Sequence, residues 1–262
     1  MREVDMEQGL FIHPLNLGTL EIEKSLLTFR SNYGLKTAVN CIAWAIKGSE
    51  KNVLVDTGPS SMGHATKYHW PLIKSASQEI DKALDVVVGL RCEDIAIIIL
   101  THLHWDHCYN LEYFPNATVY VQKSELHYAV APLPHDKRAY EIGLEHIQPP
   151  WMRVMDRIIP IEGEVEIIPG IRTIKLPGHT PGSQGVIVET MDGDWVIAGD
   201  AVPLYDNLLG NDLYSILPGG IYQNIFDFNE SLRKLEPYKG KILPAHDEGV
   251  FKQIRYPHER RS

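Results

Sequence analysis

Residues 95–107, IAIIILTHLHWDH, constrain the fold of this chain more than any other segment. They begin with an apolar, β-branched run that lacks helical periodicity, which indicates a buried strand. Side chains able to bind metal follow directly: His102, His104, Asp106 and His107. Open α/β folds place their sites at the carboxyl ends of such strands. We therefore predict a metal site where this strand ends.

The spacing of these side chains predicts two ions. His102 and His104 are two positions apart, so in an extended segment both rings point to one side. Asp106 and His107 are adjacent and must diverge, which suits a chain turning into a helix. Each pair can then hold one ion beside the other. A solvated polar loop is the alternative, but the packing of a loop requires none of these residue types.

Further ligand candidates are spread along the chain. His179, Asp200 and His246 each follow a predicted strand, and each comes directly after a small residue. A small residue lets the backbone approach a crowded centre. Asp56 follows a strand upstream, in the segment Asp-Thr-Gly, where turn formation is an alternative role.

The motif T-H-L-H-W-D-H and the segments at 56–58, 178–180, 199–200 and 245–247 resemble the metallo-β-lactamase superfamily. The layout is most similar to the N-acyl homoserine lactonases. The long stretch between Asp56 and His102, the S-E-L-H segment at 124–127 and the late H-D at 246–247 carry that similarity. The resemblance implies an α/β (α+β) fold, the αββα four-layer sandwich of two mixed β-sheets flanked by helices. It covers nearly the whole chain, and we predict one domain over residues 1–262.

The resemblance also implies roles for the ligand candidates. One ion would be held by His102, His104 and His179, a second by Asp106, His107 and His246, and Asp200 would bridge them. Zn²⁺ is the expected metal, with Mn, Fe and Co as alternatives for such donors. A water shared by two ions is acidified and becomes a bridging nucleophile. Asp106 is therefore also expected to be catalytic, and Asp56 to orient a metal-bound histidine.

Departures from the family pattern narrow the function. Asp200 stands where β-lactam-cleaving members have a cysteine ligand, and His104 where oxygen-reducing diiron members have glutamate. Pro203 replaces the tyrosine that lactonases carry three residues after the bridging aspartate. Tyr205 is a candidate for that catalytic hydroxyl, although it could instead pack or face solvent. Residues 202–226 could line an apolar pocket, with at least half of their apolar side chains expected in the core.

The leading hypothesis is a dinuclear metal hydrolase that opens a lactone or a similar small ester, and N-acyl homoserine lactones are candidate substrates. Hydrolysis of a phosphoester, or of a thioester as in glyoxalase II, is the alternative on the same metals. A metal-stabilised binding protein without turnover is a third hypothesis, but a structural metal needs no open position.

Composition limits the partners. The chain has 262 residues, 44% of them hydrophobic, and a formal charge of −9, which argues against nucleic acid. We expect a small-molecule substrate and leave the oligomeric state open, a homodimer included.

The three cysteines form no disulfide framework, which indicates a reducing compartment, and Cys108 is expected to be buried rather than a ligand. Without an apolar signal segment or membrane span, a cytoplasmic location is expected.

Local patterns predict several elements that bear on the site. Residues 10–22 are expected to be strands broken at Pro14 and Gly18, and residues 60–74 a loop. A helix is predicted over residues 75–88, ending at Gly89. Asp227 and Glu230 resemble a capping box that opens a later helix. The histidines outside the motifs are expected to lie on the surface or pack ordinarily: His13, His64, His69, His127, His135, His146 and His258.

Overall fold

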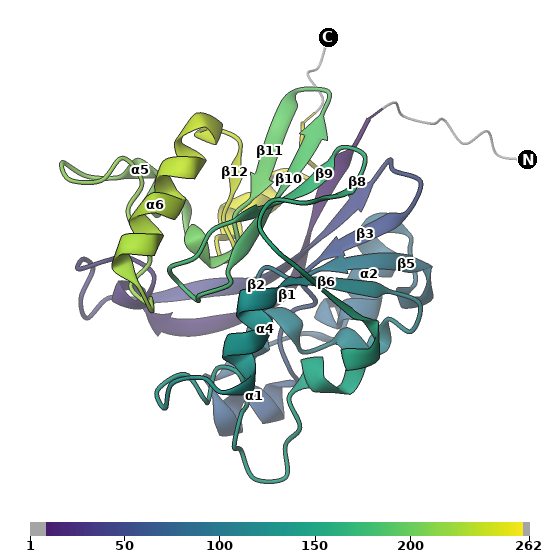
Figure 1. Cartoon of the computed structure of the whole chain (residues 1–262), viewed down its shortest axis with the longest axis horizontal. Helices are drawn as coiled ribbons and strands as arrows, with labels where there is room; N and C mark the ends of the chain where they lie inside the picture. Colours follow the sequence, from purple (N-terminus) through teal and green to yellow (C-terminus); the bar gives the residue numbers. More distant parts are fainter. Residues whose placement is uncertain (1–8, 259–262) are drawn as a thin grey trace, which may run out of the picture.

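The computed structural model describes residues 9–258, which are arranged in four layers (Figure 1). Two β-sheets pack face to face in the middle, and helices cover their outer sides. This is the αββα sandwich that the sequence predicts, and its two sheets are mixed, as expected.

The first sheet has seven strands in the order β4-β1-β2-β3-β5-β6-β7. Their bounds are β1 (Phe11–Glu23), β2 (Lys36–Lys47), β3 (Asn52–Val55), β4 (Leu72–Ile73), β5 (Ile95–Ile99), β6 (Thr118–Gln122) and β7 (Ile158–Ile161). The strands β3, β5, β6 and β7 run parallel, whereas β1 pairs antiparallel with both β2 and β4. Because β3 and β5 are parallel neighbours, the segments that follow them begin at the same edge of the sheet.

The second sheet has five strands in the order β12-β11-β10-β9-β8. Their bounds are β8 (Glu166–Ile168), β9 (Ile171–Lys175), β10 (Gln184–Thr190), β11 (Gly193–Ile197) and β12 (Ile242–Leu243). Only β11 and β12 are parallel, and the other pairs are antiparallel. The parallel pair brings the segments after β11 and β12 to one edge, and these segments contain Asp200 and His246.

The helices occupy the outer layers and the loops around the site. Their bounds are α1 (Met62–Tyr68), α2 (Ile80–Val88), α3 (Trp105–Cys108), α4 (Lys123–Val130), α5 (Tyr205–Leu209) and α6 (Ile225–Leu235), and the longest 3₁₀ segment is Pro150–Arg157. Helices α2 and α4 pack on the seven-stranded sheet, and α6 packs on the five-stranded sheet. Helix α2 ends at Gly89, which has the left-handed φ of 65° that favours glycine, as predicted.

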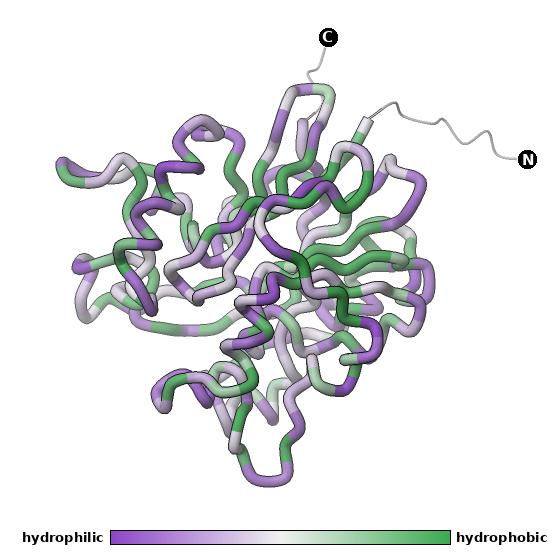
Figure 2. Tube along the Cα trace, in the orientation of Figure 1, coloured by the Kyte–Doolittle hydropathy of each residue, from purple (hydrophilic) through white to green (hydrophobic). Residues whose placement is uncertain are grey.

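Alternation along the strands divides the apolar side chains between layers. Val53 and Val55 face the other sheet, whereas Leu54 faces the helices. On the second sheet, Val186 packs between the sheets and Ile187 packs toward α6. Burying each such side chain contributes roughly 1.5–3 kcal/mol. Figure 2 shows the resulting concentration of hydrophobic chain along the central strands.

Two predictions about chain breaks were wrong. Residues 11–23 form one strand, in which Pro14 is paired with Trp44 of β2. Strand β4 pairs with β1 only at Thr19 and Leu20, so Pro14 has no second strand neighbour that needs its missing N–H. Gly18, with a φ of 129°, lies in a bulge of β1 and does not end the strand.

The predicted loop over residues 60–74 contains α1 and β4. Ser61 is the N-cap of α1, and its hydroxyl accepts a hydrogen bond from the His64 N–H at 3.4 Å. The predicted capping box of α6 is also wrong. Asn224 is the N-cap, because its side-chain oxygen accepts from the N–H of Phe226 at 3.0 Å.

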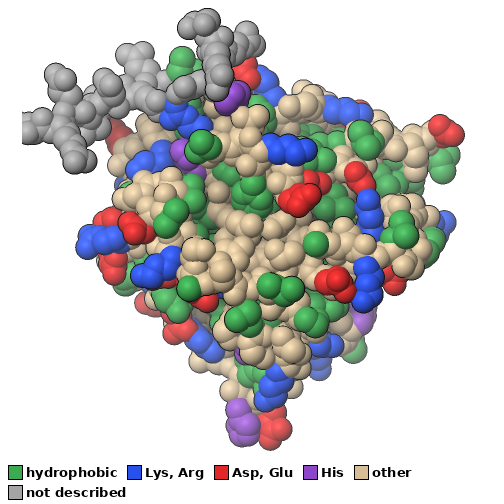
Figure 3. Space-filling model, turned by 180° about the vertical axis from the view of Figure 1, so that it is seen from behind, with side chains coloured by type: hydrophobic (Ala, Val, Ile, Leu, Met, Phe, Trp, Pro, Cys, Tyr) green, Lys and Arg blue, Asp and Glu red, His purple; other side chains and the backbone are tan. Residues whose placement is uncertain are grey.

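The outer surface is polar and mixed in charge. On the face in Figure 3, Lys and Arg side chains are interspersed with Asp and Glu, and hydrophobic side chains occur among them. Across residues 9–258, none of the helices has the length and apolar character needed to cross a bilayer. The prediction that the chain carries no signal sequence concerns its first ten residues, most of which lie outside the described range.

Candidate metal centre

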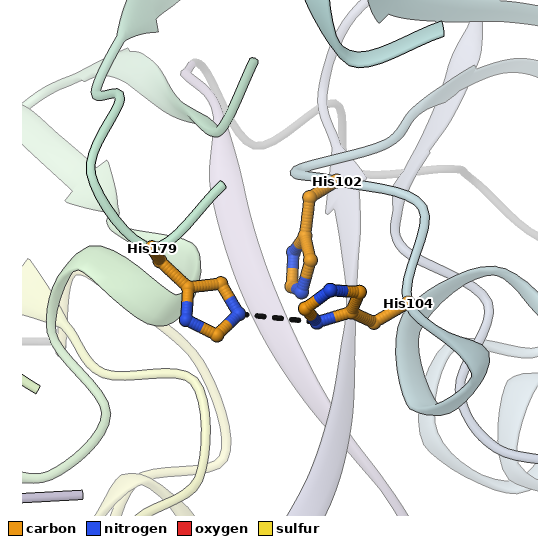
Figure 4. Close-up of side chains that lie close together, drawn as sticks. All are labelled: His102, His104 and His179. Atoms are coloured by element: carbon orange, nitrogen blue, oxygen red, sulfur yellow. Dashed lines mark hydrogen bonds between the residues drawn. The ribbon is translucent and has the colours of Figure 1, made fainter. Parts of the chain in front are cut away.

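The structure brings together all seven predicted metal ligands. The donor atoms of the first predicted set, His102, His104 and His179, lie within 4.8 Å of one another. The same holds for the second set, Asp106, His107 and His246. Asp200 lies within the same distance of His102 and His107. Figure 4 shows His179 approaching His102 and His104 from the other side of the centre.

Glycines allow these loops to approach one another. A Cβ atom on Gly199 would lie 2.9 Å from the Thr101 side chain, so the residues before Asp200 and His102 are in contact. Gly178 precedes His179 and has a φ of 138°, and a Cβ there would lie 2.4 Å from Phe228. Any larger residue would push the loop away from the sheet or from α6. The expectation that small residues permit close approach is met at both positions.

Hydrogen bonds on the outer side of three imidazoles orient them. The Nδ1 atom of His107 lies 2.8 Å from Asp56 Oδ2, that of His179 lies 3.0 Å from the Ile221 carbonyl, and that of His246 lies 2.9 Å from the Asn40 carbonyl. These oxygens accept hydrogen bonds, so each Nδ1 carries the proton. Each Nε2 then presents its lone pair inward, which is the tautomer a metal ligand requires.

His102 and His104, the first two of the three histidines in the motif, are buried. His102 has a buried Nε2 without a hydrogen-bond partner, and His104 meets His179 through Nδ1, which lies 3.1 Å from His179 Nε2. Burial lowers the pKa of both imidazoles well below the usual value, so both are neutral. A buried nitrogen with no partner is costly, because its desolvation is uncompensated. A bound cation would compensate it.

Asp200 lies between the two sets of histidines. Its Oδ1 is 3.1 Å from the Nε2 atoms of both His107 and His246, and its Oδ2 is 3.4 Å from the Nε2 of His179. Burial opposes ionisation of Asp200, but these histidines outweigh it and hold the pKa well below the usual value. The carboxylate conversely raises the pKa of His246 and His107, although burial alone would lower both.

These observations fit a dinuclear metal site. Two groups of donors face one shared carboxylate, the buried Nε2 of His102 has no hydrogen-bond partner, and imidazole and carboxylate are ligands of divalent transition metals.

Asp56 connects the strand β3 to the motif. Its Oδ1 accepts from the Thr101 N–H at 2.7 Å, and its Oδ2 accepts from the Thr101 hydroxyl at 2.7 Å and meets His107 Nδ1. The Thr101 hydroxyl lies 3.1 Å from His102 Nδ1. Asp56 therefore contacts His107 rather than the centre, in agreement with the orienting role that the resemblance implies.

Glu125 organises the site, and the sequence analysis missed it. Its buried carboxylate accepts from the Leu103 N–H at 3.0 Å and the Tyr140 hydroxyl at 2.7 Å through Oε1, and from the Thr180 hydroxyl at 2.6 Å through Oε2. Leu103 lies between two motif histidines and Thr180 follows His179, so one carboxylate connects both ligand loops. Burial raises the pKa of Glu125. Its position at a predicted helix start carried no signal of this role.

Tyr205 is not brought to the centre. Its partly buried ring packs against the core between the sheets, and its hydroxyl donates to Tyr256, whose own hydroxyl donates to the Val250 carbonyl at 2.8 Å. Burial raises the pKa of Tyr205, and the side chain takes no part in lining the cavity described below. Cys108 is buried, burial raises its pKa, and its thiol donates to the Leu103 carbonyl. As expected, it is not among the ligand groups.

A cavity of about 260 Å³ opens over the centre. Its floor contains five of the predicted ligands: His104, Asp106, His179, Asp200 and His246. Its apolar wall comes mainly from the N-terminal strands, with Leu20, Ile22 and Val39, and from Trp105. Of residues 202–226, only Ile221 joins this lining, so the expectation of a pocket built by that segment was largely wrong. Leu204, Ile216 and Leu217 are buried in the core instead.

Two histidines assigned to the surface or to ordinary packing also line the cavity. They are His69 and His135, which line it together with Arg138. The imidazole of His69 is stacked on Trp105, with ring centroids 4.2 Å apart and planes 4° apart. These residues come from segments far from the motif in sequence, so their spacing carried no signal.

A family profile described as the Metallo-beta-lactamase superfamily matches residues 37–246. The chain belongs to that superfamily. An alignment of 163 residues with an N-acyl homoserine lactonase of Bacillus thuringiensis has 29% identity. It covers 58% of this chain and 60% of the relative. An alignment of 201 residues with a probable metallo-hydrolase of Methanocaldococcus jannaschii has 28% identity. It covers 77% of this chain and 73% of the relative.

Solved structures show the same fold. The B. thuringiensis lactonase AiiA, in a mutant with N-decanoyl-L-homoserine bound at its active site, aligns with a TM-score of 0.73 and 23% identity over 94% of this chain and 95% of that one. A probable metal-dependent hydrolase of Staphylococcus aureus aligns with a TM-score of 0.74 and 20% identity. That alignment covers 92% of this chain and 90% of the hydrolase. The match to the curated B. thuringiensis lactonase spans about 60% of its length.

Proposed function

We propose that this protein is a metal-dependent hydrolase that opens a lactone or a similar small carboxylic ester. The observation that carries the proposal is the floor of the cavity, where inward-facing imidazoles and the Asp200 carboxylate converge beneath an apolar wall. Metal-binding groups that face a cavity leave room for substrate, whereas a structural site would be closed.

The ligand roles follow the two groups of donors. We assign one ion to His102, His104 and His179, a second to Asp106, His107 and His246, and the bridge to Asp200. Two such ions, for which Zn²⁺ is our first choice, supply Lewis acidity and an acidified water when bound. The protein holds the imidazoles in the required tautomer through outward hydrogen bonds, and Asp106, on the floor of the cavity, is suited to accept a proton there.

The walls favour a substrate with an apolar part and a polar head. Leu20, Ile22 and Val39 provide an apolar surface next to the metal-binding floor. His135 and Arg138 provide polar groups in the same lining. At about 260 Å³, the cavity suits a small molecule rather than a polymer. Since relatives of this chain include N-acyl homoserine lactonases, these lactones are the first substrates to test.

A substrate screen on metal-defined protein tests the proposal. Protein stripped by a chelator and reloaded with Zn²⁺, Mn²⁺, Fe²⁺ or Co²⁺ is assayed with an acyl homoserine lactone, an aryl ester, a thioester and a phosphodiester. We expect turnover of the lactone or the ester, its loss on stripping, and its loss in His104→Ala. The matched control is His146→Ala, because the His146 side chain is 90% exposed.

Phosphodiester hydrolysis without lactone or ester hydrolysis would overturn the substrate class and leave the metal site intact. Full metal loading with no turnover of any of the four substrates would overturn the hydrolase assignment and favour a binding protein.

A further inference from the structure

A second cluster of metal-binding side chains lies beside the cavity. His64, His69 and Glu141 place their donor atoms within 4.8 Å of one another. The Nε2 atoms of His64 and His69 lie 2.5 Å and 3.0 Å from the same oxygen, Glu141 Oε1. None of these residues belongs to the dinuclear centre, and the function proposed above uses none of them as a ligand.

The Glu141 carboxylate is incompletely compensated. It is buried, and its Oε2 has no hydrogen-bond partner. The ion pairs within residues 9–258 give Glu141 only His64 and His69, with neither Lys nor Arg. Buried carboxylates are normally paired with a cation or coordinate a metal. A divalent cation would engage this carboxylate and supply the missing positive charge.

The spacing of the donors matches that of the main centre. There, His104 Nδ1 and His179 Nε2 are 3.1 Å apart, as are His246 Nε2 and Asp200 Oδ1. Here the two contacts with Glu141 are 2.5 and 3.0 Å. Both clusters therefore have donor atoms converging on one point.

We propose that His64, His69 and Glu141 form a third metal site, selective for Zn²⁺ or a similar transition metal. Two imidazoles and one carboxylate are a ligand set that zinc favours, and water would fill the remaining position. The His64 side chain is 15% exposed, which gives the ion a route from solvent. Metal binding would replace the protons that now lie between the histidines and Glu141.

The third ion would fix one wall of the cavity. His64 is in α1, and His69 follows it and lines the cavity, whereas Glu141 comes two residues after Ala139, which lines the same cavity. Arg138 already joins the two segments, since its guanidinium donates to the carbonyls of Tyr68 and His69. The His69 ring in turn is stacked on Trp105, next to two of the predicted ligands of the main centre. Coordination would add a stronger link at this junction.

Metal analysis of the full chain tests the proposal. Titration with Zn²⁺ followed by removal of free metal is expected to leave three equivalents on the wild type. We expect two on His64→Ala and two on Glu141→Gln, which keeps the size of the side chain but removes its charge. The exposed His146→Ala is expected to retain three. Asp200→Ala, which empties the main centre, is expected to keep one equivalent of zinc at the third site. The double variant Asp200→Ala, His64→Ala is expected to lose that equivalent as well.

Anomalous X-ray scattering at the zinc edge locates the ion directly, even if a variant fails to fold. A peak among His64, His69 and Glu141 in crystals of the Zn²⁺-loaded wild type is expected. Peaks confined to the main centre, with equal zinc content in wild type and both variants, would overturn the proposal and leave a hydrogen-bonded His–Glu–His cluster. Absence of zinc from the main centre would instead contradict the proposed function.

Discussion

The two sheets contribute to the same centre in different ways. The seven-stranded sheet supplies four predicted ligands from the single segment that follows β5, at residues 102–107. The five-stranded sheet supplies three from separate segments that follow β9, β11 and β12. In the first case the spacing along one chain segment orients the side chains. In the second, the packing of small residues between distant loops brings each ligand into place.

The difference indicates where each half is vulnerable. The segment after β5 is held by hydrogen bonds that Thr101 and His107 donate to the Asp56 carboxylate. The dispersed ligands meet at Asp200, which contacts histidines of both groups. Glu125 connects the two halves through Leu103 and Thr180. Substitutions at these points are expected to have different effects.

The largest effect is expected from Asp200→Ala. Loss of the shared carboxylate should weaken both ions, so metal content should fall from two equivalents at the main centre toward zero. Activity should fall at least about a hundredfold, because metal ions contribute several kcal/mol of transition-state stabilisation. Elemental analysis and kcat/KM measure the two effects, and Asp212→Ala, at an exposed position, is the control. Retention of both ions would show that the halves do not depend on a shared carboxylate.

A smaller and one-sided effect is expected from Asp56→Asn. The amide no longer stabilises the Nδ1–H of His107 as a charged acceptor does. Loss of such an outer partner typically lowers metal affinity by about 10–100-fold. Competition with a chelator should detect weaker binding of the ion at His107, while the ion at His104 and His179 binds as in the wild type. Equal weakening of both ions would contradict the division into two groups.

Glu125→Gln is expected to reduce stability. In the wild type, the Thr180 hydroxyl and the Gly182 N–H donate to one carboxylate oxygen, and the Leu103 N–H and the Tyr140 hydroxyl donate to the other. In the variant, the amide nitrogen would replace one of these oxygens and could not accept from its pair of donors. The cost is about 1–3 kcal/mol for donors left unpaired in the interior. Chemical denaturation of metal-free protein measures it, with the exposed Glu93→Gln as the control. Unchanged stability would mean that the two ligand loops do not depend on their common carboxylate.

The smallest effect is expected from Tyr205→Phe, outside the centre. The change removes only the hydroxyl that donates to Tyr256. Stability should fall by about 1 kcal/mol, the usual net value of a hydrogen bond. The kcat and the metal content should match those of the wild type. A tenfold fall in kcat with both ions present would instead restore Tyr205 as a catalytic group.

Much of the centre could be predicted from the sequence because its signals are local. The run after residue 95 has the composition of a buried strand, and the motif that follows is dense in ligands. The small residues before His179 and Asp200 are needed at close contacts with Phe228 and Thr101. The glycine that ends α2 is likewise a local signal, and it predicted the end of that helix correctly.

Other features depend on contacts that no local pattern encodes. Glu125 looks like an ordinary residue near a helix start, and only folding places it between Leu103 and Thr180. Pro14 continues a strand because no second neighbour pairs with it there. The same limit applies to Tyr205, whose hydroxyl is directed to Tyr256 by core packing.

The sequence by itself determined the family, the layered fold and the side chains able to bind metal, because strand composition and ligand spacing act over a few residues. The tertiary structure alone decided which side chains line the cavity and which groups orient the ligands. It also decided the meeting of His64 and His69 with Glu141, more than seventy positions away along the chain. Those contacts arise when the two sheets pack, since the side chains of distant segments become neighbours only in the folded chain.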